Sequence, residues 1–118
     1  MLTDTRKSPN AGLRGLPFSD VEWTGGLYKE RFDTCTASMV PHLQKMFESR
    51  DISHVLENFK IAAGDADGDF DGTVFGDGDF YKWMEAAVYT AVRSDNRELL
   101  ERLEEYEMCI RDRWRTAP

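Results

Sequence analysis

The chain has 118 residues, a length that suits one domain and leaves little room for a second domain with its own core. It carries 15 Lys and Arg against 22 Asp and Glu, a formal net charge of −7, and no basic stripe follows any predicted helix. A nucleic-acid binder is therefore disfavoured, whereas a hydrophobic content of 41% allows a modest core.

The first part of the chain is predicted to be an arm followed by a helix. Residues 1–20 contain Ser, Pro, Asn and Gly with little periodicity, which is typical of an extended arm. From about Leu27, apolar residues recur at steps of three and four, which predicts a helix. Because Pro41 lacks an amide donor and disfavours helical geometry at Val40, we expect this helix to stop or kink before it resumes over residues 42–47.

A short helix and an acidic loop come next. The helix has apolar residues from Val55 to Ile61, and Asp51 or Ser53 can provide its N-cap. Residues 64–79 hold five of the nine glycines and six aspartates. So much flexible backbone and like charge predicts a loop without regular structure.

The strongest helical pattern covers residues 80–92, and Asp79 is its expected N-cap. Its apolar residues form one stripe along a helix. They are Phe80, Trp83, Met84, Ala87, Val88 and Ala91.

A final helix is predicted to start at Asp95, which with Glu98 resembles a capping box. Its expected buried residues are Leu99, Leu100, Leu103 and Tyr106. Arg102 lies four residues after Glu98, the spacing of a helical ion pair. Apart from residues 73–75 no segment alternates like a strand, so the predicted fold class is all-α.

Cysteines, histidines and apolar runs give little functional signal. No apolar run is long enough to cross a bilayer and no secretory signal is visible, so we expect a soluble cytoplasmic protein without a membrane partner. Cys35 and Cys109 form no C-x-x-C pair, which predicts reduced thiols and no zinc site in this chain. Cys35 is expected in the core, and His42 and His54 receive no role.

The acidic loop partly resembles an EF-hand. Counted from Asp67, oxygen donors stand at positions 1, 3 and 5, with Gly at 6 and an apolar residue at 8. Position 12, which should be a bidentate Glu, is Gly78. A solvated acidic loop is therefore favoured, and the alternative function is a small helical calcium-binding module that uses the loop from Asp65 to Asp71.

A second group of residues, 74–86, places two carboxylates, aromatic residues and a lysine at the mouth of a helix. Carboxylates can bind sugar hydroxyls and aromatic faces can stack on a sugar ring, so these residues can line a sugar pocket. Alternatively, Asp79 caps the helix, Trp83 packs in the core and Asp77 turns the loop. Asp77 is the candidate substrate-binding residue.

Two motifs form a joint signal: N-F-x-x-A-A-G at residues 58–64 and V-F-x-D-x-D-x-Y-K-W-x-E-A at residues 74–86. Together with residues 21–31 and 40–42, they resemble in order and spacing the N-terminal end of the glycoside hydrolase family 127 type of β-L-arabinofuranosidase. The resemblance covers about residues 21–105.

The resemblance implies a retaining hydrolase of terminal β-L-arabinofuranosides, built on an (α/α)6 toroid with β-sandwich domains behind it. It also implies a zinc ion held by three Cys and one Glu, one Cys being the nucleophile, and a separate acid/base Glu. None of these residues falls in this chain. Residues 21–106 would then be the first few helices of the toroid, inactive alone, with apolar stripes that lack neighbouring helices. The expected partner is an arabinofuranoside, and the sequence leaves open whether the complete enzyme is a homodimer.

The end of the chain carries a separate resemblance. The segment E-M-C-I-R-D-R at residues 107–113 resembles the translation of a sequencing-library adapter. Residues 107–118 are therefore expected to be a non-native tail on a truncated gene fragment. The alternative is an ordinary helix end, where cations suit the helix dipole.

Overall fold

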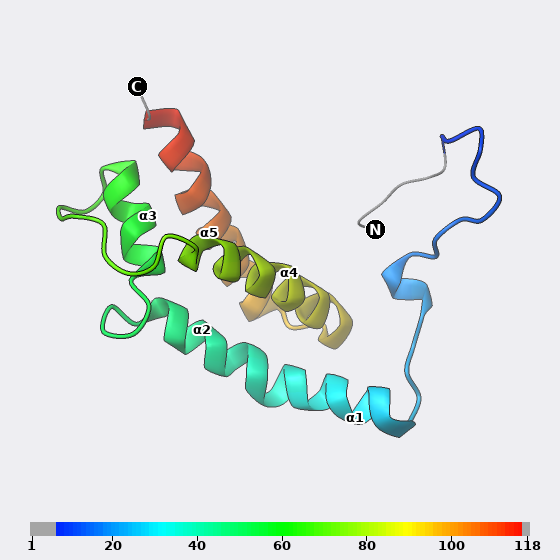
Figure 1. Cartoon of the computed structure of the whole chain (residues 1–118). Helices are drawn as coiled ribbons and strands as arrows, with labels where there is room; N and C mark the ends of the chain where they lie inside the picture. Colours follow the sequence, from blue (N-terminus) through cyan, green and yellow to red (C-terminus); the bar gives the residue numbers. More distant parts are fainter. Residues whose placement is uncertain (1–6, 117–118) are drawn as a thin grey trace. The chain divides into compact units, whose positions relative to one another are not determined.

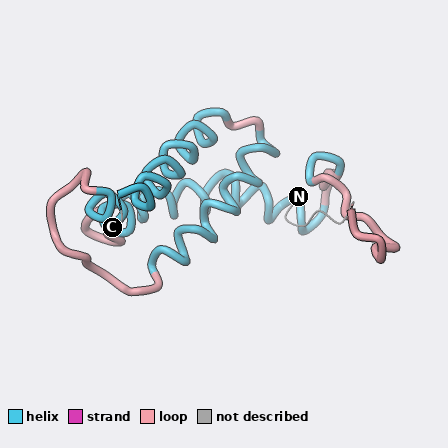
Figure 2. The backbone as a smooth tube through the Cα atoms, turned by 90° about the horizontal axis from the view of Figure 1, so that it is seen from above, coloured by secondary structure: helices cyan, strands magenta, loops and turns pink. Residues whose placement is uncertain are grey.

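The computed structural model describes residues 7–116, so the parts of the predicted arm and tail at residues 1–6 and 117–118 lie outside it. The chain forms two compact units, one ending at Arg31 and one beginning at Phe32. The described residues contain helices and loops and no strand (Figure 2), which confirms the all-α fold class. Over the same residues, no helix combines the length and apolar character of a bilayer span.

The first unit is largely irregular, as its composition predicts. A short 3₁₀ turn at Phe18–Asp20, which the sequence did not indicate, interrupts the extended segment. The Phe18 ring meets the Trp23 ring edge-on, with 6.4 Å between centroids. The unit ends at Arg31, which lies within helix α1 (Gly26–Thr34).

Helix α1 (Gly26–Thr34), a π-helical turn (Cys35–Met39) and helix α2 (Val40–Glu48) follow one another without a break. The prediction of a stop or kink at Pro41 is therefore wrong. Val40 has helical angles, φ −62° and ψ −48°, and Pro41 stands in the first turn of α2. Pro41 cannot donate to the turn before it, and the π-helical turn at Cys35–Met39, where the Val40 amide already bonds five residues back, accommodates that missing bond.

Helix α3 (Val55–Ala63) confirms the predicted short helix, but its N-cap is His54 rather than Asp51 or Ser53. His54 has a left-handed backbone, φ 56°. The Ser53 hydroxyl still accepts a hydrogen bond of 3.4 Å from the first amide of α3. The cap could not be chosen from the sequence because several polar residues compete within one short turn.

Helix α4 (Gly76–Ser94) begins four residues before the predicted start at Phe80. Phe75 precedes its first turn, so the prediction of Asp79 as N-cap is wrong. Asp77 and Asp79 both lie in that turn, where the helix dipole favours negative charge. Because a carboxylate is stabilised at each of these positions, the aspartates do not show at which residue the helix begins.

Helix α5 (Arg97–Thr116) starts one residue later than the predicted capping box implies. Asp95, the predicted cap, is instead the left-handed residue that ends α4, with φ 51°. The Asn96 side-chain oxygen accepts a 3.0 Å hydrogen bond from the Leu99 amide, which is the N-cap interaction. Asn96 therefore caps α5.

The core of the second unit lies between these helices. Helix α5 packs against α3 and α4, and α2 packs against the same two helices (Figure 1). The buried core residues are Val40, Val55, Phe59, Phe80, Trp83, Ala87, Leu103 and Tyr106. The expectation that the α4 stripe lacks neighbouring helices is therefore wrong for this stripe, although one predicted member, Val88, is 41% exposed.

A polar cluster joins α2 to α5. Arg102 binds Glu48 at 2.9 Å and Glu105 at 2.6 Å, rather than the predicted Glu98, and the Tyr106 hydroxyl donates to Glu48. Burial alone would raise the pKa of Glu48, but hydrogen bonds from Tyr106 and Arg102 lower this pKa below its usual 4.5. Burial and the Glu48 carboxylate raise the pKa of Tyr106 to about 12.

Candidate functional site

Asp77 lies at a pocket of about 350 Å³ between α3, the loop that follows it and the first turn of α4. The pocket brings together the two sequence motifs that are separated by this loop. The first motif contributes Asn58, Phe59 and Ala62, and the second contributes Val74, Gly76 and Asp77. Ser53, Val55, Phe70 and Thr73 complete the lining. The volume falls within the range of about 300–1,000 Å³ for small-molecule sites.

Asp77 is half-buried and its carboxylate is oriented by the helix that carries it. One carboxylate oxygen, Oδ1, accepts a hydrogen bond of 2.9 Å from the next amide, Gly78. The N-terminal end of α4 also favours a negative charge at this position. Asp77 thus supports the turn and lines the pocket, so the two interpretations of this residue are compatible.

Asn58 fastens the acidic loop to α3. Its Nδ2 donates to the Asp71 carbonyl oxygen at 2.7 Å, and its Oδ1 accepts from the Asp71 amide at 3.1 Å. The His54 ring adds a contact, with Nε2 3.3 Å from the Asp71 carboxylate. Neither side chain was given a role from the sequence. His54 and Asn58 are four residues apart, about one helical turn, but no sequence pattern links them to Asp71, which lies 13 positions after Asn58.

The other residues of the predicted sugar pocket lie elsewhere. Asp79 is exposed and accepts a 3.1 Å hydrogen bond from Lys82. Trp83 is 4% exposed, and its indole nitrogen donates to the Val40 carbonyl oxygen at 3.1 Å. Trp83 therefore packs in the core, and the pocket retains Asp77 from this group.

The family model of the β-L-arabinofuranosidase GH127 catalytic domain matches residues 20–111, which includes both motifs at the pocket. The chain belongs to this family. It is accordingly a member of a glycoside hydrolase family. The match extends through residues 107–111, inside the segment that resembles an adapter.

A curated relative supports membership of the GH127 family. The non-reducing end β-L-arabinofuranosidase of Bifidobacterium longum subsp. longum is 36% identical over 81 residues. The aligned part covers 69% of this chain and 12% of that relative. The chain therefore spans a small part of the relative's length. No solved structure matches the chain.

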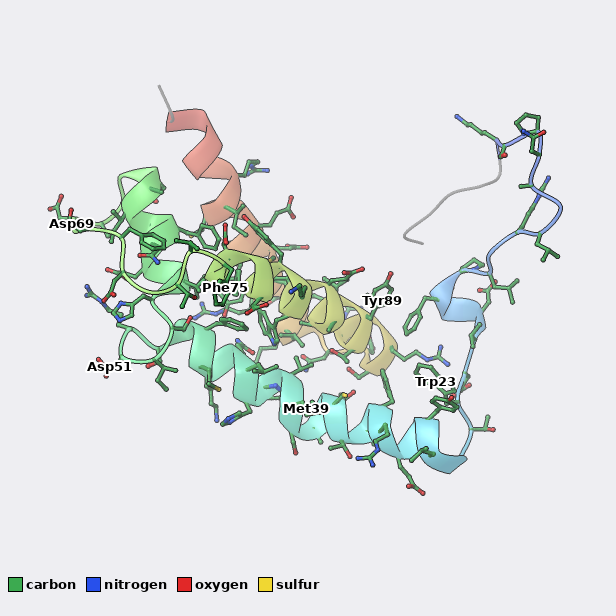
Figure 3. The ribbon with its side chains drawn as sticks, viewed as in Figure 1. Trp23, Met39, Asp51, Asp69, Phe75 and Tyr89 are labelled. Atoms are coloured by element: carbon green, nitrogen blue, oxygen red, sulfur yellow. The ribbon has the colours of Figure 1, made fainter. Side chains whose placement is uncertain are left out.

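The acidic loop of this GH127 chain does not form a metal site in the described conformation. Asp69 lies at the outer bend of the loop (Figure 3), and Asp71 is held by His54. Across residues 7–116, no three His, Cys, Asp or Glu side chains lie together in a group that could hold a metal ion. The loop carboxylates do not converge as an EF-hand requires.

The zinc set that the resemblance implies does not fit this part of the GH127 domain. Three Cys are needed and the chain has two, Cys35 and Cys109, both free thiols. Cys35, predicted in the core, is instead half-buried, with its Sγ 3.6 Å from the sulfur of Met39. These residues cannot supply the metal-bound nucleophile.

Proposed function

We propose that the chain is part of a glycoside hydrolase that releases terminal β-L-arabinofuranose, and that the chain alone is inactive. The observation that carries this proposal is the pocket where both GH127 motifs meet. The aligned part covers 12% of the relative, which supports the proposal that most of the hydrolase, with its zinc site, lies in other segments. The two free thiols support a cytoplasmic location.

Within this function, Asp77 binds a hydroxyl of the sugar. It is half-buried at the pocket, and the first turn of α4 holds its carboxylate in one orientation. A hydrogen bond between a hydroxyl donor and a charged carboxylate contributes about 1.5–3 kcal/mol. Asp77 is thus a binding residue and takes no part in bond cleavage.

The test compares Asp77→Ala with Asp79→Ala in the full-length hydrolase. Asp79 is a matched control because it lies in the same turn but outside the pocket. We expect Asp77→Ala to lower kcat/KM by about 10- to 150-fold, while the melting temperature changes little. If Asp77→Ala destabilises the fold and leaves kcat/KM unchanged, Asp77 only structures the turn.

The inactivity of the isolated chain is tested separately. The purified 118-residue chain is incubated with an aryl β-L-arabinofuranoside, and release of the aryl group is followed. No turnover is expected, because two cysteines cannot form the implied metal set. Turnover would contradict the proposal that catalysis needs segments outside this chain.

A further inference from the structure

We propose that Phe70 is the surface on which the sugar ring stacks in this pocket. The inference rests on the proposed function, since it deepens the account of the Asp77 pocket. Phe70 and Asp77 line the same pocket, although one lies in the loop and the other in α4.

The exposure of Phe70 distinguishes it from the other phenylalanine of the pocket. Phe59 is 2% exposed because its ring packs in the core, whereas Phe70 is 61% exposed. A large aromatic side chain at a pocket, with most of its surface in solvent, can still bury that surface against a ligand. Phe59 has almost no surface left to offer.

The backbone next to Phe70 is held in place. The following residue, Asp71, accepts a hydrogen bond from Asn58 Nδ2 at its carbonyl, donates one from its amide to Asn58 Oδ1, and contacts His54 through its carboxylate. A loop that carried Phe70 without such contacts would lose conformational entropy when a ligand bound. These contacts of Asn58 and His54 with Asp71, here called the clamp, therefore fix the backbone beside Phe70 before the sugar binds.

The chemistry of the lining matches a sugar ring. Carboxylate and hydroxyl groups of Asp77 and Thr73 can bond ring hydroxyls, while Phe70 and Val74 offer apolar surface to the C–H face of a sugar. The hydrogens of sugar C–H groups carry a partial positive charge and an aromatic face carries a partial negative charge. Stacking therefore contributes more to the binding free energy than the buried area alone. The lining therefore offers both polar and apolar groups to a sugar ring.

The experiment measures KM and kcat of the full-length hydrolase with methyl β-L-arabinofuranoside as the probe. We expect Phe70→Ala to raise KM about three- to tenfold while kcat stays within about twofold. Phe70→Tyr should restore KM because it keeps the ring face, and Phe70→Leu should not. Phe75→Ala is the matched control: Phe75 is 64% exposed, close in sequence and not one of the residues that line the pocket.

Two failures can be told apart. If the wild-type enzyme hydrolyses the probe but Phe70→Ala matches Phe75→Ala in KM, stacking on Phe70 is wrong and the proposed function stands. Equal rescue by Leu and Tyr would also overturn stacking, because an apolar volume would then suffice. If the wild-type enzyme hydrolyses no β-L-arabinofuranoside, the proposed function fails and this inference fails with it.

Discussion

The indole nitrogen of Trp83 in α4 donates a 3.1 Å hydrogen bond to the carbonyl oxygen of Val40 at the start of α2. We expect Trp83→Phe to lower the free energy of unfolding by about 2 kcal/mol, because it removes this bond and leaves a small void. Urea denaturation of the chain measures the change. Trp23→Phe, at a residue 37% exposed, should stay within about 0.5 kcal/mol. Equal losses in both variants would contradict the role of the bond.

Glu48 should make the fold sensitive to acid. Its pKa in the folded chain is lowered below the usual 4.5, so its contribution to stability is complete above about pH 4.5 and is lost as pH falls through the folded pKa. We expect Glu48→Gln to flatten the fall in unfolding free energy between about pH 5 and pH 3. Glu105→Gln, which removes the other partner of Arg102, should keep the acid slope.

Tyr106 should give an opposite, alkaline effect. Its pKa is raised from 10.0 to about 12, so its contribution is complete below about pH 10 and is lost as pH rises toward 12. The stability difference between the wild type and Tyr106→Phe should therefore shrink as the pH is raised from about 10 to 12. Tyr28→Phe, at a side chain 72% exposed, is the control. A constant difference for Tyr106→Phe would show that the hydroxyl is not coupled to folding.

The N-cap residue of α5, Asn96, can be compared with Asp79 in the first turn of α4. We expect Asn96→Ala to cost about 1 kcal/mol of unfolding free energy, because the Leu99 amide loses its acceptor. Asn96→Ser should recover most of that loss. Asp79→Ala should cost less than about 0.5 kcal/mol, since Asp79 only pairs with exposed Lys82. A larger loss of unfolding free energy for Asp79→Ala would show that Asp79 caps α4.

The acidic loop should not bind calcium tightly. Gly78 supplies no carboxylate at the twelfth position of the EF-hand pattern, and Asp71 is engaged by His54. Calorimetric titration of the chain with CaCl₂ is expected to give no binding with micromolar affinity. Micromolar affinity that Asp67→Asn abolishes would favour the calcium-binding alternative.

The helices and much of the core could be predicted from the sequence because their signal is periodic. Phe80 and Ala87 recur on one helical face, and both are fully buried. The helix caps could not be predicted in the same way. Asp95 and Asn96 are adjacent and both are good caps, so the choice depends on how the chain turns between α4 and α5.

Tertiary contacts explain what the sequence could not reveal of the candidate site. Asp77 was selected because the residue type and helix entrance suit a sugar, and the structure places it at a pocket. The clamp between Asn58 and Asp71 exists only after the loop folds back on α3, so no local pattern indicates it. Phe70 was missed for the same reason, since a single aromatic residue in a Gly- and Asp-rich loop has no periodic neighbours.

The π-helical turn before α2 changes the phase of the helix that contains it. In an unbroken α-helix, Val40 would lie about 140° around the helix from Cys35. Here Val40 is 5% exposed, whereas Met39 before it is 52% exposed. The Val40 amide bonds to the Cys35 carbonyl five residues back, so Val40 takes the inward place. Because this turn holds one residue more than an α-helical turn, deleting one residue from it should restore α-helical bonding and leave the Val40 carbonyl facing Trp83.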